Sequence, residues 1–184
     1  MVRLFEKIDA ALGRPTALVN NAGTVGPVGR VEDIDGAALR AVFELNVIGC
    51  FLCAREAIRR MSTQHGGQGG GIVNVSSIAA RLGNANRWVH YAASKGALDT
   101  FIFGLARKVG PDGIRVNAAA PGLIDTEIHE AAGGSECCPP IVQDAPLAES
   151  VRLTPEEVAE TILWLLSDGA SFVTGTGVEV CGGR

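Results

Sequence analysis

A tyrosine and a lysine stand four residues apart in this 184-residue chain, in the run Tyr91-Ala-Ala-Ser-Lys95. Residues at positions i and i+4 lie on the same face of a helix, so the two side chains can meet. A nearby ammonium favours the phenolate, and we therefore expect Lys95 to lower the pKa of Tyr91 from its usual value of about 10. Such a tyrosine can give or take a proton near neutral pH. Taken alone, the pair is more typical of an ordinary helix surface than of a catalytic site.

Two further polar positions could take part in this chemistry. Ser76 and Ser77 end an apolar strand upstream, and a hydroxyl there can hydrogen-bond a substrate oxygen, although serines at strand ends are commonly turn formers. Asn46 falls on the apolar stripe of a long helix, where a buried amide needs a hydrogen-bond partner such as a backbone group or an ordered water. The alternative for Asn46 is a helix-kinking or partly exposed asparagine.

An alternation of helices and short apolar strands must position these residues. We expect helices at 2–12, 36–62, 89–109 and 155–167, and strands at 16–20, 72–76, 114–118 and 177–181. Strands of this kind, separated by helices, imply an α/β fold with a doubly wound parallel sheet covered on both faces, in three layers. A glycine-rich loop is expected at 66–71. The residues Thr154, Pro155 and Glu157 predict a capping box with proline at the first helical position.

The ends of these strands carry small or polar residues. Strand 16–20 runs into Asn20-Asn21-Ala22-Gly23, and strand 114–118 runs into Pro121-Gly122, with Thr126 four residues later. Ligands of open parallel sheets bind beyond the carboxyl ends of the strands. We therefore expect these segments and the serines to line one crevice.

Composition excludes several other classes of protein. Hydrophobic residues make up 47% of the chain and charged residues 20%, which is enough to bury a core. The net charge of −4, without a basic cluster, argues against a nucleic-acid partner. No uncharged apolar stretch reaches the roughly 18 residues of a membrane span, and residues 2–12 are amphipathic rather than a signal peptide. Five cysteines without secretory features indicate free thiols in a reducing, cytoplasmic compartment, and the histidines show no metal-ligand spacing with them.

Together these motifs resemble the short-chain dehydrogenase/reductase family over nearly the whole chain. The matching segments are Asn20–Gly23, Asn46 in Glu-Leu-Asn-Val-Ile-Gly, Ser77 in Ile-Val-Asn-Val-Ser-Ser, Tyr91 with Lys95, Pro121-Gly122 with Thr126, and Thr174-Gly175 with Gly182-Gly183. The resemblance implies a Rossmann-like fold and hydride transfer between a nicotinamide cofactor, NAD or NADP, and a small-molecule carbonyl or alcohol substrate. It also implies a homodimer or homotetramer formed through helices 36–62 and 89–109.

The same resemblance implies a role for each site residue. Tyr91 would exchange a proton with the substrate oxygen, which Ser77 would hold. Lys95 would lower the Tyr91 pKa and bind the nicotinamide ribose, and Asn46 would position a water in a proton relay to Lys95. The residues expected to line the cofactor are Asn21, Ala22, Gly23, Tyr91, Lys95, Pro121, Gly122, Ile124 and Thr126. The segment at about 120–153 looks like the family's substrate loop.

Two features depart from the family pattern. Ser77 precedes Tyr91 by fourteen residues, one more than the commonest spacing, and Ser76 is the alternative. The family's opening strand and its Thr-Gly-x-x-x-Gly-x-Gly turn are not found in residues 1–184. We therefore expect a single partial domain that lacks about 70 residues of a typical member, as a fragment or misplaced start rather than a genuine short product.

Two other readings of the sequence follow from that departure and from the cysteines. One is a truncated, non-catalytic protein that serves as an oligomerisation or interaction module, because the missing turn would supply the phosphate-binding backbone. The other treats the adjacent Cys137 and Cys138 as a thiol or metal site, although no nearby ligand set supports it.

Overall fold

A computed structural model describes residues 1–85, 87–124, 126, 128 and 154–183. The α-helices are α1 (Val2–Leu12), α2 (Gly36–Phe43), α3 (Gly49–Met61), α4 (Ala79–Leu82), α5 (Val89–Val109) and α6 (Pro155–Leu166). The strands are β1 (Ala17–Asn20), β2 (Gly70–Val75), β3 (Ile114–Pro121) and β4 (Gly177–Val180). A π-helix, η2 (Glu44–Ile48), joins α2 to α3.

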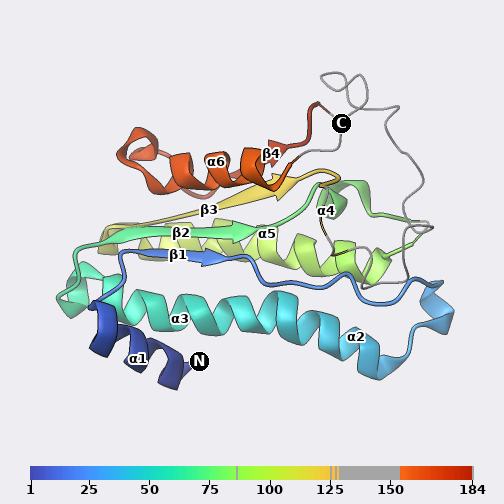
Figure 1. The fold of residues 1–184 in the computed structure, drawn as a ribbon, viewed down its shortest axis with the longest axis horizontal. Helices are drawn as coiled ribbons and strands as arrows, with labels where there is room; N and C mark the ends of the chain where they lie inside the picture. The colour runs from blue at the N-terminus through green and yellow to red at the C-terminus, as the bar shows by residue number, and fades with distance from the viewer. Residues whose placement is uncertain (86, 125, 127, 129–153, 184) are drawn as a thin grey trace.

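The strands form one parallel sheet in the order β1-β2-β3-β4. In Figure 1 the strands point the same way, with α6 on one face of the sheet and the other long helices on the opposite face. Adjacent residues of β2 show this division, because Ile72 packs with α3 and α5 while Val73 packs with α6. The expected three-layer α/β fold is therefore confirmed for the described residues.

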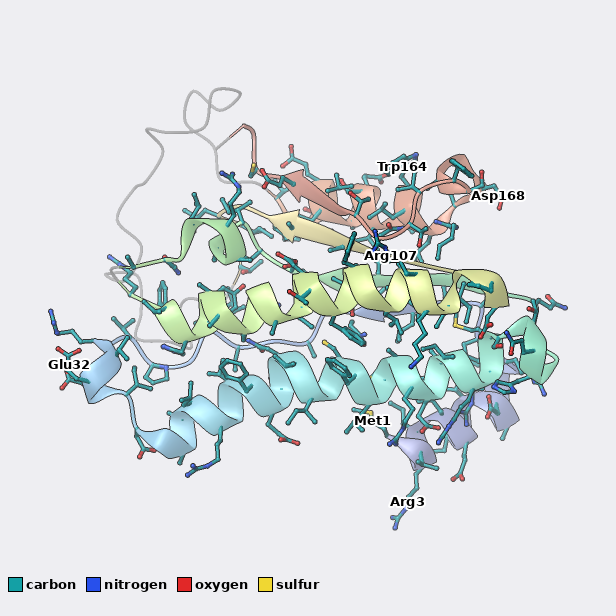
Figure 2. All side chains as sticks on the ribbon, turned by 180° about the vertical axis from the view of Figure 1, so that it is seen from behind. Met1, Arg3, Glu32, Arg107, Trp164 and Asp168 are labelled. Carbon is teal, nitrogen blue, oxygen red and sulfur yellow. The ribbon has the colours of Figure 1, made fainter. Side chains whose placement is uncertain are left out.

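The helical layer opposite α6 contains two long helices that run side by side. Figure 2 views this layer from behind, with α5 beside the continuous helix made of α2, η2 and α3. The apolar cluster between them and the sheet includes Ala54, Leu98 and Ile102. This packing places the first turns of α5 near the carboxyl ends of β1 and β2.

The observed boundaries refine the expected ones. Helices 2–12 and 89–109 occur as predicted, and β3 extends past 118 because Ala118–Pro121 pairs with Gly177–Val180 of β4. Strand β2 starts at Gly70, inside the expected loop. Gly70 has a φ of 151°, and a Cβ there would lie 2.0 Å from the Thr16 carbonyl oxygen, so this close approach requires glycine.

The helix Gly36–Met61 bears on the expectation that the chain has no apolar stretch long enough to span a membrane. It is 26 residues long, and its most apolar 18-residue window has a mean hydropathy of 1.7. By length and composition it could cross a membrane, and it is the one such helix among the described residues. Core helices of globular proteins pass the same test. Contacts tie this helix to the domain, because Asn46 hydrogen-bonds the backbone of Thr24, and Arg60 pairs with Asp9 of α1 at 2.7 Å.

Candidate active site

A cavity of about 610 Å³ lies at the carboxyl ends of β1, β2 and β3. Its walls come from the segments that follow these strands, from α4 and from the start of α5. The sequence-predicted residues that line it are Asn21, Ala22, Gly23, Ser77, Tyr91, Lys95, Pro121, Gly122, Ile124 and Thr126. Residues from four separate parts of the chain therefore meet beyond the carboxyl ends of the strands, as the sequence predicted.

Tyr91 and Lys95 lie on the face of α5 that is turned to this cavity. The Lys95 ammonium is 5.6 Å from the centre of the Tyr91 ring, and it donates a 2.7 Å hydrogen bond to the Val75 carbonyl oxygen at the end of β2. Lys95 is buried. The carbonyl therefore anchors the cation between the strand end and the tyrosine.

The pKa values of this pair differ from the sequence expectation. Burial raises the pKa of Tyr91, and a hydrogen bond with Ser77 opposes the rise. Burial also lowers the pKa of Lys95 to about 8, against the opposing effects of Cys50 and Asp99. The expectation that Lys95 lowers the Tyr91 pKa is wrong in this structure, because removing the phenolate from water outweighs the neighbouring groups.

The two serines at the end of β2 have separate partners. Ser77 shares a hydrogen bond with Tyr91, and its hydroxyl accepts the Ala79 N–H at 3.1 Å, so it also starts α4 as a turn former. Ser76 is buried and donates a 2.6 Å hydrogen bond to the Asp99 carboxylate on α5. Ser77 is therefore the serine paired with Tyr91, and α4 takes up part of the long spacing between them.

Asn46 sits in the π-helix and does not line the cavity. Its Oδ1 accepts the Thr24 N–H at 2.9 Å, and its Nδ2 donates to the Thr24 carbonyl at 2.9 Å and to Ser94 Oγ at 3.0 Å. Ser94 donates in turn to the Tyr91 carbonyl at 2.7 Å. The expected buried partner is thus a backbone group. Through these hydrogen bonds Asn46 connects the segment after β1 to the first turn of α5.

The residues just before Tyr91 also hold the segment after β1, and sequence reasoning missed them. His90 Nε2 lies 3.0 Å from the Val25 carbonyl oxygen, and Trp88 Nε1 donates to the Gly26 carbonyl at 3.2 Å. Gly26 has a φ of 72°, and a Cβ there would lie 2.7 Å from Val42. The signal available in the sequence was their position next to Tyr91.

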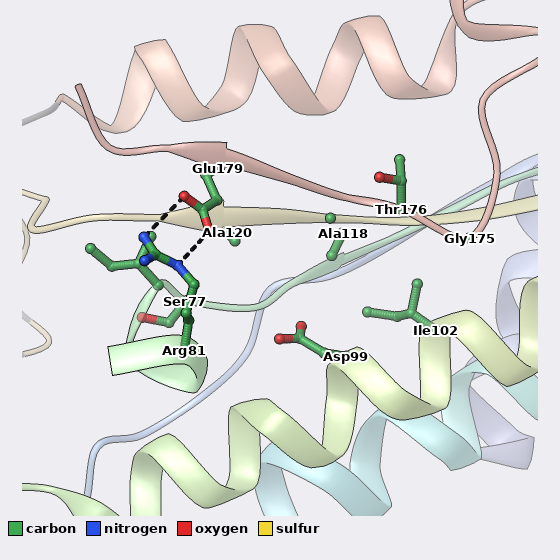
Figure 3. Close-up of a pocket in the computed structure, with 11 residues that line it drawn as sticks. Ser77, Arg81, Asp99, Ile102, Ala118, Ala120, Gly175, Thr176 and Glu179 are labelled. Carbon is green, nitrogen blue, oxygen red and sulfur yellow. Dashed lines mark hydrogen bonds and ion pairs between the residues drawn. The ribbon is translucent and has the colours of Figure 1, made fainter. Parts of the chain in front are cut away.

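A second missed residue is Asp99, four positions after Lys95 on the same helical face. Burial raises its pKa, while Ser76 and Lys95 oppose the rise. Figure 3 shows Asp99 facing a smaller cavity of about 270 Å³, which Ser77 also borders. Across that cavity Arg81 of α4 pairs with Glu179 of β4 at 2.9 Å. These polar contacts hold α4 and β4 beside the serine.

Some expectations fall outside the described residues. Most of the predicted substrate loop at about 120–153, and both Cys137 and Cys138, belong to this part of the chain. Within the described part, no group of three His, Cys, Asp or Glu side chains could hold a metal ion.

Comparisons with known proteins place this geometry in a family. Residues 1–184 match the family model described as Enoyl-(Acyl carrier protein) reductase. The chain is 45% identical over 184 residues to the uncharacterized oxidoreductase YgfF of Escherichia coli, and it spans 74% of that protein's length. It is 38% identical over 180 residues to cis-4-hydroxycyclohexanecarboxylate dehydrogenase of Sinomonas cyclohexanicum, covering 98% of this chain and 70% of the relative.

Solved structures agree with the sequence relatives. The 3-ketoacyl-(acyl-carrier-protein) reductase from Brucella melitensis complexed with NADH has a TM-score of 0.87 at 28% identity, covering 97% of this chain and 71% of that one. A 7α-hydroxysteroid dehydrogenase complexed with NADH and 7-oxo glycochenodeoxycholic acid also has a TM-score of 0.87, at 32% identity, with coverage of 98% and 68%. By its sequence, its parallel sheet and the residues brought together at the sheet edge, the chain belongs to the short-chain dehydrogenase/reductase family.

Proposed function

We propose that this chain is an NAD(P)-dependent oxidoreductase that transfers a hydride between nicotinamide and a carbonyl or alcohol substrate. The observation that carries the proposal is the meeting of Tyr91, Lys95 and Ser77 in the 610 Å³ cavity. The relatives named above are oxidoreductases or dehydrogenases, and two similar structures contain NADH. The alternative of a non-catalytic interaction module is not favoured, since the named relatives are oxidoreductases or dehydrogenases and Tyr91, Lys95 and Ser77 line one cavity.

The residues at the strand ends fit the nicotinamide part of such a cofactor. A Cβ on Gly23 would lie 3.3 Å from Asn46 Oδ1 and 3.6 Å from Lys95 Nζ, so a side chain there would fill the space beside the ammonium. Asn21, Ala22, Pro121 and Gly122 would line the same side. The cofactor, when bound, supplies or accepts the hydride.

The chain's own groups would handle the proton. Because burial raises the pKa of Tyr91, the phenol is protonated at neutral pH and can donate to the carbonyl oxygen during reduction. Ser77 would hydrogen-bond that oxygen. Lys95, with a pKa of about 8, is largely cationic at pH 7 and would stabilise the phenolate that forms. Alcohol oxidation needs the reverse proton transfer and is favoured at higher pH.

Asn46 is a positioning residue in this proposal. Its hydrogen bonds to Thr24 and Ser94 connect the cofactor-lining segment after β1 to the turn that carries Tyr91. A water relay from this region to Lys95 stays a prediction from the family resemblance.

We also propose that the protein works as a homodimer or homotetramer in the cytoplasm. Leu45, Ile48 and Phe51 form an exposed apolar stripe on the helix Gly36–Met61, and Phe51 stacks on Phe101 of α5 with ring centres 3.7 Å apart. This stripe, continued onto α5, suits a second copy of the chain. The free thiols of Cys50, Cys53 and Cys181 suit a reducing compartment.

The test compares the wild type with Tyr91→Phe, using NADH and NADPH with a panel of ketones. We expect the substitution to lower kcat by about 100-fold or more, because the proton donor is lost while the ring remains. Calorimetric titration with each dinucleotide is the control, and it should give the same affinity for both proteins. Unchanged turnover in Tyr91→Phe would remove Tyr91 from its assigned role. Failure of the wild type to bind either dinucleotide would support the non-catalytic alternative.

A further inference from the structure

One cation in the wall of the active-site cavity, Arg87, forms no ion pair with the acidic side chains of the described residues. Arg87 lies between α4 and α5 and lines the cavity beside Trp88. Its Nη1 is buried and makes no hydrogen bond, and the guanidinium carbon is 5.8 Å from the centre of the Trp88 ring. A buried guanidinium N–H without an acceptor costs free energy, so a native structure that keeps one usually has a use for it.

The charge of the cavity is also one-sided. Among the lining residues that the structure describes, the charged ones are Arg87 and Lys95, and both are cations. Lys95 already donates to the Val75 carbonyl and lies beside Tyr91. Its charge therefore belongs to the part of the cavity where the proposed proton transfer takes place. Arg87, in contrast, lines the cavity without an acidic partner among the described residues.

An anionic group on a bound molecule would supply the hydrogen-bond acceptor that Nη1 of the Arg87 guanidinium lacks. The planar fork of a guanidinium matches the two oxygens of a carboxylate, and such charge-assisted pairs are stronger than neutral hydrogen bonds. The apolar surroundings strengthen the pair further, since Leu82, Trp88 and Ile128 also line the cavity.

We propose that Arg87 binds a carboxylate on the substrate, so that the protein acts on carbonyl or alcohol compounds carrying an acid group away from the reacting carbon. The inference rests on the proposed function only in calling the bound molecule a substrate. Arg87 then selects the substrate by its charged end, while Tyr91 and Ser77 act on its oxygen.

Binding of a matched pair of probes tests the proposal. The probes are 4-oxopentanoate and its methyl ester, which differ in the negative charge, and each is titrated calorimetrically into the purified chain. The wild type should bind the acid about tenfold or more tightly than the ester. Arg87→Gln should abolish this preference, and Arg87→Lys, which keeps the charge without the fork, should retain part of it.

A matched control removes the same charge elsewhere. Arg3 is exposed on α1, on the far side of the helical layer from the sheet, and Arg3→Gln should keep the full preference for the acid. Equal affinity of the wild type for both probes, or no binding of either, overturns the proposal. So does a loss in Arg87→Gln of affinity for NADPH or NADH rather than for the acid, because Arg87 would then serve a cofactor phosphate.

The outcomes separate this inference from the proposed function. The wild type could bind 4-oxopentanoate more tightly than the methyl ester and yet reduce neither compound with NADH or NADPH. The oxidoreductase proposal then fails while the carboxylate site stands. The wild type could instead reduce 4-oxopentanoate and its methyl ester with the same kcat/KM, and Arg87→Gln could leave both values unchanged. The carboxylate site then fails while the oxidoreductase proposal stands.

Discussion

Burial acts on Tyr91 and Lys95 in opposite directions, and both shifts favour their neutral forms. It raises the pKa of the phenol and lowers that of the ammonium, because each charged form loses hydration near the end of β2. Tyr91 is therefore protonated at neutral pH, which suits the proton-donor role proposed for it. Since Tyr91 is the only tyrosine in the chain, its ionisation can be observed directly.

We expect the phenolate absorbance of the folded protein to appear at a pH above that of the urea-unfolded chain, whose tyrosine titrates at about 10. The measurement is a spectrophotometric titration from neutral pH upward, with circular dichroism at each point to confirm that the fold persists. A Tyr91→Phe sample supplies the baseline. A folded-state midpoint below that of the unfolded chain would instead mean that Lys95 dominates over burial.

Lys95 should make the stability of the protein rise with pH between about 8 and 10.5. The folded state loses the Lys95 proton near pH 8, whereas the unfolded state keeps it up to about pH 10.4, so over this interval the unfolded state binds more protons and folding is favoured as pH rises. Relative to Lys95→Met, the wild type should gain about 2 kcal/mol of unfolding free energy between pH 7.5 and 9.5. Urea unfolding of both proteins at the two pH values measures this. Parallel changes in the two proteins would mean that Lys95 has an ordinary pKa.

At the scale of elements, the site depends on short connections between a strand end and a helix. The π-helix Glu44–Ile48 interrupts the long helix where Asn46 reaches Thr24, and α4 fills the space between Ser77 and the start of α5. Residue spacing predicted a single helix over 36–62, and it predicted the strand before α4 and the helix after it. It did not predict the connections themselves, because both depend on hydrogen bonds to distant segments.

The capping box of α6 is a local feature that was predicted and is confirmed. The Thr154 hydroxyl accepts the Glu157 N–H at 3.4 Å, and the Glu157 carboxylate accepts the Thr154 N–H at 2.8 Å. The helix that it begins packs Val158 and Leu165 against the sheet.

Thr154→Ala should lower the free energy of unfolding by about 1 kcal/mol, because it leaves the first-turn N–H group without its acceptor. Thr154→Ser keeps the hydroxyl and should remain close to the wild type. Urea unfolding of the three proteins gives the comparison. Equal midpoints for all three would mean that water replaces the cap at no cost.

For the whole molecule, the exposed apolar stripe of the helix Gly36–Met61 is the surface that the proposed assembly would bury. Phe51 is 46% exposed although it stacks on Phe101, and its neighbours Leu45 and Ile48 are exposed as well. A second copy that covers this stripe would remove it from water, and a charge placed in the middle would oppose that contact.

We expect the wild type to sediment as a dimer or tetramer and Phe51→Glu to sediment as a monomer. Phe172→Glu is the matched control, because Phe172 is fully exposed between η7 (Asp168–Ala170) and β4 and lies outside the proposed interface. Sedimentation velocity at several concentrations distinguishes these outcomes. A wild type that is monomeric throughout would contradict the proposed assembly.

The sequence by itself predicted which residues meet at the sheet edge and which elements carry them. Tyr91 and Lys95 share a helical face because of their spacing, and the small residues after β1 and β3 meet because parallel strands end at one edge. Those inferences need only local periodicity and the direction of the strands.

Only the tertiary structure decided the pKa values of these residues and their hydrogen-bond partners. It raised the Tyr91 pKa instead of lowering it, paired Ser77 rather than Ser76 with Tyr91, and joined Asn46 to Thr24. In the part of the chain that the structure describes, it also leaves Arg87 Nη1 without a hydrogen-bond acceptor. Desolvation and hydrogen bonding depend on groups that are distant in the chain, so residue spacing alone could not predict their balance.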